Sequence, residues 1–359
     1  MESPNWKIQS LKMLKKSYIS ELRQDIVSGD WVVVAEARSR RPHEFRKLKK
    51  SVFETPKSRC QFEDPQKSGN LDPLLAYDRN SHHLKVKGQD KDYSSWFIQV
   101  IGNKYPAFGR GICKTILRHG PYTWQEGVGY HEVVITRPHD RGLSRFETEE
   151  VEIVLKTYRQ RFLDLRSDAC VDYISVFHNA GKEAGASISH PHSQLIAIPV
   201  IPPDVFRSLR GSQDFFERNK KCVHCFMIAW EKKARERILF ENDEFIVFIP
   251  FAPRVSCETR IFPKKHSPHF WMIDDESLPF AAEALRQALA RLNKGLGNPD
   301  YNFFIHTAPV KGNTFEHYHW HIEILPKTAI WAGFELGTGI EVSVVKPEEA
   351  AKFLRSIKV

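Results

Sequence analysis

The chain of 359 residues contains no run of 18 uninterrupted apolar residues, so the sequence predicts no membrane-spanning helix. Its first six residues lack the charged-then-apolar order and the small-residue cleavage site of a secretory leader. Apolar residues still make up 41% of the chain, including 24 phenylalanines, and this is enough for a substantial core. We therefore expect a globular, cytoplasmic protein that does not associate with membranes.

Signatures of nucleic-acid binding are also missing: no zinc-finger, RNA-recognition or helix-turn-helix pattern occurs, although the formal net charge is +9. The first 60 residues carry 14 Lys and Arg against 7 Asp and Glu, a balance that suits phosphate-bearing partners such as nucleotides. Arg38 and Arg41 follow a predicted strand, where guanidinium groups match the geometry of a diphosphate or form a solvated turn. We expect a nucleotide partner and no nucleic acid.

The most informative segment is His190-Pro191-His192-Ser193-Gln194, which follows a stretch of small residues. In an extended backbone, residues two apart project to the same face, so His190, His192 and Gln194 are expected to point together. An imidazole can attack phosphorus and form a covalent intermediate, and a neighbouring amide can bind a phosphoryl oxygen. The alternative is a histidine-rich strand end with structural hydrogen bonds only.

Cysteines are few, six in all, and two of them form the hook Cys222-Val223-His224-Cys225. In a reducing compartment this spacing predicts half of a metal site rather than a disulfide. Cys222 and Cys225 with His266 and His319 make a plausible tetrahedral zinc site, which is structural because four protein ligands leave no open position. His306, His317 and His321 are alternative ligands. The cysteines that show no partner pattern are interpreted as packing residues: Cys113, Cys170 and Cys257.

A weaker set of the same kind occurs in the first half of the chain. Cys60 and Glu63 have the spacing of the second hook, with a carboxylate in place of one thiol. Together with His131 and His190 they form a chemically acceptable zinc site. A site held by hydrogen bonds without a metal is the alternative, because one soft ligand is lost.

The two halves of the chain follow one plan. Each half has apolar strands, one amphipathic helix, a further strand and then a histidine-rich segment, in the same order. The predicted strands are 31–35, 96–101, 131–136 and 173–177 in the first half and 244–249, 259–262, 301–306 and 317–325 in the second, with helices at 151–165 and 278–293. We predict a duplicated α+β fold with halves at 1–205 and 206–359.

These features resemble the galactose-1-phosphate uridylyltransferase family of the histidine-triad superfamily. The His-Pro-His-x-Gln segment, preceded by Asn179-x-Gly181 and Gly185-x-Ser187, carries most of the resemblance, which extends from residues 28–34 to residues 333–339. It implies two histidine-triad-like halves, each with an antiparallel sheet and packed helices. It also implies zinc as the cofactor and a homodimer.

The resemblance assigns a role to individual residues. His192 resembles the nucleophile that takes a nucleoside monophosphate from a nucleotide sugar, and His190 resembles a metal ligand beside it. The positions that match substrate-binding residues are Gln194, Asn179, Gly185, Ser187, Asn103, Phe334 and Glu335, together with Arg38 and Arg41, which in the family reach the diphosphate across a dimer interface.

The implied reaction is a ping-pong exchange of UMP between UDP-glucose and galactose 1-phosphate through a nucleotidyl-histidine. Two departures leave alternatives open. Glu63 replaces the usual second cysteine, and the Cys222/Cys225 pair resembles a branch similar to ADP-glucose phosphorylases, which transfer AMP to inorganic phosphate. The chain is therefore predicted to be a uridylyltransferase that exchanges UMP between UDP-glucose and galactose 1-phosphate, with an ADP-glucose phosphorylase-like adenylyltransferase as the alternative. A non-catalytic nucleotide-binding protein is the remaining alternative.

Overall fold

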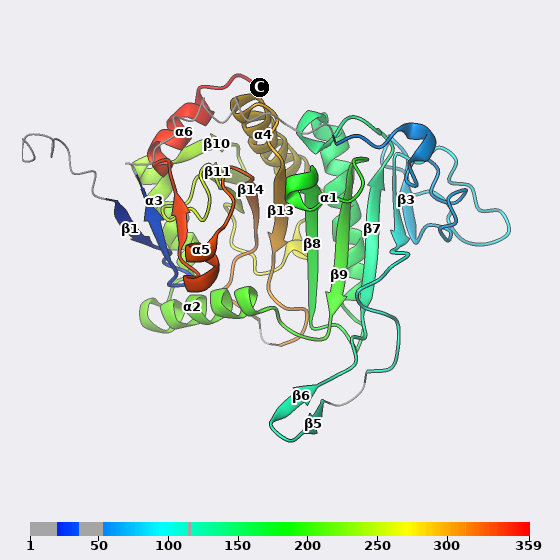
Figure 1. Ribbon diagram of the computed structural model, residues 1–359, viewed down its shortest axis with the longest axis horizontal. Helices are drawn as coiled ribbons and strands as arrows, with labels where there is room; N and C mark the ends of the chain where they lie inside the picture. The colour runs from blue at the N-terminus through cyan, green and yellow to red at the C-terminus, as the bar shows by residue number, and fades with distance from the viewer. Residues whose placement is uncertain (1–19, 36–52, 114–115, 313) are drawn as a thin grey trace, which may run out of the picture.

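The structure is a computed structural model that describes residues 20–35, 53–113, 116–312 and 314–359 (Figure 1). Arg38 and Arg41, predicted to bind a diphosphate, lie outside the described residues.

A ten-stranded sheet forms the centre of the molecule, and all its neighbouring strands are antiparallel (Figure 1). Its first five strands, in spatial order, are β3 (Leu75–Tyr77), β4 (Ile98–Gly102), β7 (Tyr130–Thr136), β9 (His192–Ile198) and β8 (Tyr173–Ala180). The other five are β13 (Tyr301–His306), β14 (His321–Pro326), β12 (Thr259–Pro263), β11 (Phe245–Phe248) and β10 (Ile238–Glu241).

The sheet consists of two copies of one five-stranded unit that meet where β8 pairs with β13. Moving outward from this seam, the chain order of the strands is the same on both sides: β8, β9, β7, β4 and β3 match β13, β14, β12, β11 and β10. The α+β fold with two duplicated antiparallel halves is therefore confirmed. The exact division at residue 205 stays a prediction, since the described sheet runs continuously across it.

One long helix from each half covers the same face of the sheet: α1 (Thr148–Leu165) and α4 (Leu278–Leu296) (Figure 1). Apolar residues recur on one face of each helix and join the sheet in a single core cluster, as the predicted periodicity requires. A capping box between Glu147 and Glu150 begins α1, and Gly297 in a left-handed conformation ends α4.

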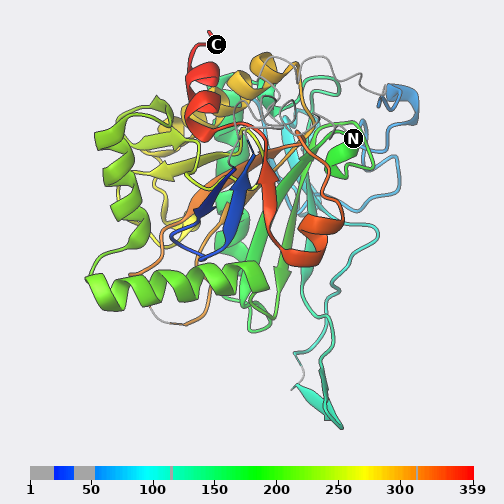
Figure 2. The ribbon, with the colours of Figure 1, turned by 60° about the vertical axis from the view of Figure 1, so that its left-hand side comes forward.

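The N-terminal hairpin lies on the C-terminal half. β1 (Glu21–Gln24) pairs with β2 (Trp31–Val34), and β2 pairs in parallel with β15 (Glu341–Ser343) (Figure 2). Arg23 donates to the Glu348 carboxylate at 2.9 Å and fixes the hairpin to the last helix. The strand predicted at 31–35 thus exists, but it contributes to a separate three-stranded sheet rather than to the N-terminal half-sheet.

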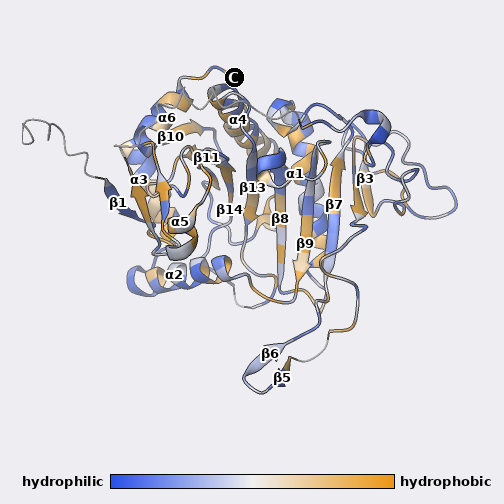
Figure 3. Ribbon diagram, in the orientation of Figure 1, coloured by the Kyte–Doolittle hydropathy of each residue, from blue (hydrophilic) through white to orange (hydrophobic). Residues whose placement is uncertain are grey.

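The other helices are short or lie at the periphery. They are α2 (Pro203–Asn219), α3 (Val223–Ala234), α5 (Gly333–Thr338) and α6 (Pro347–Arg355), with 3-10 turns at Lys57–Arg59, Leu143–Arg145, Lys182–Ala184 and Phe270–Met272. Apolar residues concentrate in the central strands, whereas α2 is largely polar (Figure 3). Among the described residues, no helix is both long and apolar enough to cross a membrane.

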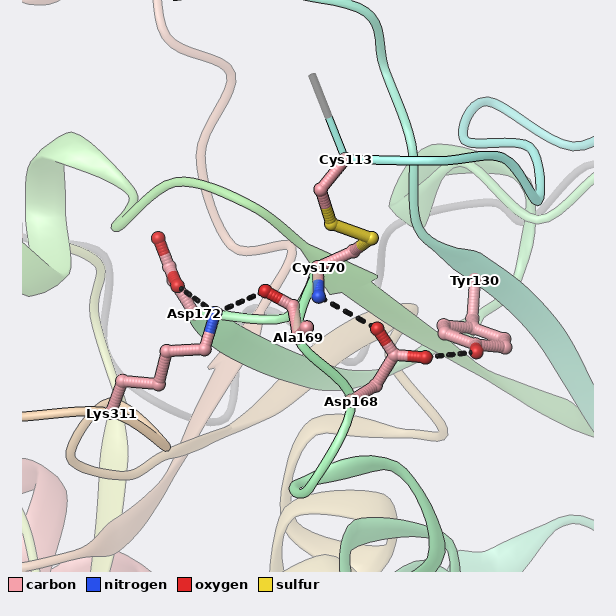
Figure 4. Close-up of a disulfide and its surroundings, with 7 residues drawn as sticks. All are labelled: Cys113, Tyr130, Asp168, Ala169, Cys170, Asp172 and Lys311. Atoms are coloured by element: carbon pink, nitrogen blue, oxygen red, sulfur yellow. Dashed lines mark hydrogen bonds and ion pairs between the residues drawn. A yellow bond between two sulfur atoms is a disulfide. The ribbon is translucent and has the colours of Figure 1, made fainter. Parts of the chain in front are cut away.

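The hairpin β5 (Leu117–His119) and β6 (Tyr122–Trp124) projects away from the body of the molecule (Figures 1 and 2). The chain leading to it is tied to the turn after α1 by a disulfide between Cys113 and Cys170 (Figure 4). The prediction that these two cysteines are unpaired packing residues was wrong, because residues distant in sequence meet at this turn. Cys257 is a free, fully buried thiol, as predicted.

Candidate active site

His192 is the first residue of β9, where its side chain is 7% exposed. Its Nδ1–H donates to the backbone carbonyl of His190 at 2.8 Å. A carbonyl only accepts hydrogen bonds, so in the neutral ring Nε2 carries no proton and presents its lone pair. Burial lowers the pKa of His192, which keeps the ring neutral. The Phe62 ring contacts it edge-on, with the two ring centroids 5.0 Å apart.

The opposite face of β9 is held by a buried polar chain. Tyr158 of α1 hydrogen-bonds to Ser193, and Ser193 hydrogen-bonds to Nδ1 of His178 at 2.9 Å. All three side chains are buried. Burial, together with the nearby His192, lowers the pKa of His178 to about 3. The strand that carries His192 is therefore fixed on its other face by neutral groups.

Two carboxamides face the same side of the sheet as His192. Gln194 follows it by two residues on β9, and Asn179 lies across from it at the end of β8. The Asn179 Oδ1 accepts a hydrogen bond from Asn302 at 2.7 Å, so its amide hydrogens stay available to a ligand. The adjoining loop contains Gly185 at φ 87°, a conformation that favours glycine, and Ser187 is exposed on the same loop.

Cys60, His139 and His190 form one candidate metal centre. The Cys60 Sγ lies 3.5 Å from the Nδ1 of His190, and Glu63 reaches the Nδ1 of His139 at 2.9 Å. His131, predicted as a ligand here, is not in this group. It contacts Gln194 instead, because it lies near the start of β7 whereas His139 follows the end of that strand.

The hydrogen bonds of this centre fit a bound metal ion. Nε2 of His190 donates to the Thr136 carbonyl at 2.7 Å, and Nε2 of His139 donates to the Thr55 carbonyl at 2.8 Å. Both rings therefore leave Nδ1 unprotonated, and these two nitrogens lie 3.1 Å apart. Two lone pairs at that distance repel each other, and either a shared proton or a metal ion between them removes the repulsion. Carbonyl-oriented imidazoles of this kind are typical of metal ligands.

Cys222, Cys225, His266 and His319 form the second candidate centre, as the sequence predicted. The Cys225 Sγ lies 3.4 Å from Nδ1 of His266 and 3.5 Å from Nδ1 of His319. Tetrahedral zinc with bonds of about 2.3 Å to sulfur and 2.0–2.1 Å to nitrogen places such atoms about 3.5 Å apart. His319 also donates from Nε2 to the Pro263 carbonyl at 2.9 Å. The residues therefore fit a structural zinc ion.

A family model described as galactose-1-phosphate uridyl transferase, N-terminal domain, matches residues 9–202, more than half of the chain. The chain belongs to this family. A second model, for a domain of unknown function (DUF4921), matches residues 146–356. Membership of the galactose-1-phosphate uridylyltransferase family makes the protein an enzyme of the nucleotidyltransferase class.

The relatives of this chain differ in the nucleotide that appears in their names. An ADP-glucose phosphorylase of Arabidopsis thaliana is 34% identical over 94% of this chain and 93% of its own length. A galactose-1-phosphate uridylyltransferase of Thermotoga maritima is 27% identical over 94% of this chain and 99% of its own. The crystal structure of an Arabidopsis thaliana ADP-glucose phosphorylase with bound ADP-glucose has a TM-score of 0.77 at 31% identity, covering 95% of this chain and 100% of that one.

The second half of this family member carries a changed copy of the His192 site. His321 follows His319 by two residues and donates from Nδ1 to the His319 carbonyl at 3.0 Å, as His192 does to His190. Glu323 then occupies the position of Gln194. Burial alone would raise the pKa of Glu323, but Arg260 and Arg254 hold it well below its usual value.

The Glu323 carboxylate only accepts hydrogen bonds and is engaged by Arg254 and Arg260, so the second half lacks the amide donor that Gln194 supplies in the first. His306, one of the alternative zinc ligands, groups with His321 and Glu323 rather than with the cysteines. His317 belongs to none of the candidate metal groups among the described residues.

The remaining predicted substrate residues of the uridylyltransferase motif lie in two places. Asn103 lies beside His131, near Gln194. Phe334 and Glu335 lie on α5, which Figure 1 shows in front of the C-terminal half-sheet, and no contact in the described part of the chain joins them to His192.

A cavity of about 760 Å³ opens beside the His192 site and is lined by His139, His178, Asn179, His190 and Asp300, among others. The sequence reasoning missed His139 and Phe62. A signal for His139 was present, because it follows its strand at the same distance as His266 follows β12.

Proposed function

We propose that the protein transfers a nucleoside monophosphate from a nucleotide sugar to a phosphate acceptor through a covalent nucleotidyl-His192. The observation that carries the proposal is the tautomer of His192, whose Nδ1–H is engaged by the His190 carbonyl and whose Nε2 is free to attack. In the first step Nε2 bonds to the α-phosphorus and the bond to the bridging oxygen breaks. The sugar phosphate leaves as an anion, and no external base is needed.

In the second step an oxygen of the acceptor phosphate attacks the same phosphorus and the P–N bond breaks. This returns His192 as a neutral ring. In the intermediate the ring is cationic, and the Nδ1–H bond to the His190 carbonyl stabilises that charge. Amide hydrogens of Gln194 and Asn179 are the donors available to the phosphoryl oxygens.

The two candidate metal centres support the site from outside. A bound zinc ion supplies a structural cross-link that fixes the orientation of its ligands. Cys60, Glu63, His139 and His190 would hold one ion and so position the His190 carbonyl that orients the nucleophile. Cys222, Cys225, His266 and His319 would hold the second.

We favour an adenylyl donor of the ADP-glucose type with phosphate as acceptor. Support comes from the Arabidopsis thaliana ADP-glucose phosphorylase, which is 34% identical and aligns over nearly the whole chain. The Cys222/Cys225 pair agrees with this branch. UDP-glucose with galactose 1-phosphate is the second candidate, favoured by the family model and by the Thermotoga maritima relative. The 760 Å³ cavity beside His190 is available to the sugar phosphate of either donor.

We further propose a homodimer. Phe334 and Glu335 lie on α5 away from His192 in their own subunit, so a second subunit would be needed for them to contact substrate there. Sedimentation at several protein concentrations tests the dimer, and a monomer at working concentration would remove this part of the proposal.

Intact-protein mass spectrometry after mixing with ADP-glucose or UDP-glucose tests the reaction. The wild type gains one AMP from the preferred donor, and His192→Ala gains nothing. His321→Gln, the matched change in the second half, retains the adduct. A gain of UMP instead keeps the mechanism and changes the donor. If neither donor gives an adduct while both bind, the protein is a nucleotide-binding protein without catalysis and the proposal fails.

A further inference from the structure

His131 is tied to the phosphate-binding side of the site by three contacts. Its Nε2 lies 2.7 Å from the Oε1 of Gln194 and 3.0 Å from the Nδ2 of Asn103. Its Nδ1 accepts a hydrogen bond from the backbone N–H of Ala107 at 3.1 Å. In the β7–β9 ladder, Val133 is paired with Gln194. His131 lies two residues before Val133, so it is the diagonal neighbour of Gln194 on the same face of the sheet.

The backbone contact determines where the proton lies on this imidazole. A peptide N–H can only donate, so the Nδ1 of His131 must be the unprotonated nitrogen. In the neutral ring Nε2 therefore carries the hydrogen and donates it to the Oε1 of Gln194, and the Nδ2 of Asn103, itself a donor, makes a close contact with this nitrogen and no hydrogen bond. This tautomer is opposite to that of His192, which carries its hydrogen on Nδ1.

The tautomer in turn determines which end of the Gln194 amide meets the substrate. With Oε1 engaged by His131, the two amide hydrogens on Nε2 are the groups left for a ligand. A phosphoryl oxygen bearing negative charge requires such donors, whereas the reversed amide would present its carbonyl oxygen and repel the phosphate. Gln194 is only partly buried, so a ligand can reach it.

We infer that His131 is a positioning residue for nucleotidyl transfer. It selects the orientation of the Gln194 amide in which the Nε2 hydrogens face the substrate. The inference rests on the proposed function, because it concerns the donor to the transferred phosphoryl group. It replaces the metal-binding role predicted for this histidine. The residue acts on the rate of phosphoryl transfer through Gln194 and does not touch the phosphate itself.

The loop that supplies Ala107 completes the arrangement. It leaves β4 at Asn103, whose Oδ1 accepts from the Tyr105 backbone N–H at 2.9 Å, and it is tied down further along by the Cys113–Cys170 disulfide. The backbone N–H of Ala107, which donates to the Nδ1 of His131, therefore belongs to a loop that is attached before it at Asn103 and after it at Cys113.

The experiment is a single-turnover measurement of nucleotidyl-His192 formation in His131→Phe, Gln194→Ala and the double variant. His131→Phe keeps a flat ring but removes both hydrogen bonds, and we expect the rate to fall by about 10- to 100-fold with little change in KM. Because the residue acts through Gln194, adding His131→Phe to Gln194→Ala should slow the reaction no further. His131→Gln retains a neutral N–H donor and should recover part of the rate.

The controls separate this inference from the proposed function. His119→Phe, the same change at an exposed histidine of the β5–β6 hairpin, should leave the rate unchanged, and zinc content in His131→Phe should equal that of the wild type. Equal rates in wild type and His131→Phe, or fully multiplicative losses in the double variant, would overturn the inference. Zinc loss would return His131 to the metal site. Absence of an adduct in the wild type would overturn the proposed function instead. If His131→Phe does not fold, the comparison of His131→Gln with Gln194→Ala decides the same question.

Discussion

On either side of the β8–β13 seam, the two halves of the sheet carry the same histidine arrangement with different neighbours. His192 and His321 have the same tautomer and the same carbonyl partner two residues earlier. The residue two positions further along is Gln194 in one half and Glu323 in the other. The amide can donate to a phosphate, and the carboxylate is instead paired with Arg254 and the buried Arg260. The duplicated scaffold thus carries an amide donor beside its histidine in one copy and an internal ion-pair network in the other.

The largest effect is expected from making the first half resemble the second. Gln194→Glu removes the amide donors and places a negative charge beside the phosphoryl group, so adduct formation should slow by about 10²- to 10³-fold. Single-turnover mass spectrometry measures this rate. The reciprocal change, Glu323→Gln, should leave the rate per folded molecule unchanged while destabilising the fold, because Arg254 and Arg260 lose a buried partner. A fast Gln194→Glu enzyme would show that the amide is not a phosphate donor.

The disulfide is a second difference between the halves, since both cysteines belong to the first. Cys170→Ser should lower the free energy of unfolding by at most about 4 kcal/mol, the chain-entropy value for cysteines at a sequence separation of 57. Urea unfolding under oxidising conditions measures the loss. Reducing the wild type with a dithiol should reproduce it, and Cys257→Ser, at a buried free thiol, serves as the non-disulfide control. Equal stability of oxidised and reduced protein would contradict the expectation.

His178 gives the first half a pH-dependent stability. Its pKa is about 3 in the folded protein, because the ring is buried, and near 6.5 in the unfolded chain. Below pH 6.5 the unfolded chain therefore binds a proton that the folded protein does not, and stability falls as the pH drops toward 3. At pH 5 this amounts to about 2 kcal/mol. His178→Gln should reduce the difference between unfolding at pH 7 and pH 5, whereas His119→Gln should not.

The smallest expected effect is a difference in zinc release between the two candidate metal centres. The second centre has two thiols and the first has one, so zinc should leave the first centre earlier during titration with a chelator. Zinc release followed by a colorimetric indicator should show two phases. Cys60→Ser should remove the early phase and Cys222→Ser the late one. A single phase unaffected by Cys60→Ser would show that the first centre holds no metal.

Local chemistry was predictable where the motif itself carries the geometry. Alternation along β9 places His192 and Gln194 on one face, and the Cys222–Cys225 hook with His266 and His319 was found because its ligands repeat a known spacing. The error at the first centre came from matching His131 with His266 by strand order alone. The two histidines that lie with the cysteines, His139 and His266, both follow the ends of their strands, so the register of each strand end was needed to select His139.

Long-range contacts were beyond sequence reasoning. The pairing of Cys113 with Cys170 depends on where a loop and a turn meet, and no local pattern encodes that meeting. The packing of β1 and β2 on the C-terminal half was unpredictable for the same reason. No local pattern in these strands indicates that β2 pairs with β15. The role of His131 became visible only when its tautomer could be read from the donor at Ala107.

The parallel pairing of β2 with β15 joins segments that are almost a full chain length apart. On the ribosome, β2 emerges long before β15, so it must wait for its parallel partner while the intervening residues are synthesised. During that interval its free edge, with Trp31 exposed, is open to other chains. Expression yield and aggregation during synthesis should therefore respond to changes at residues 341–343 more strongly than the small size of that strand suggests.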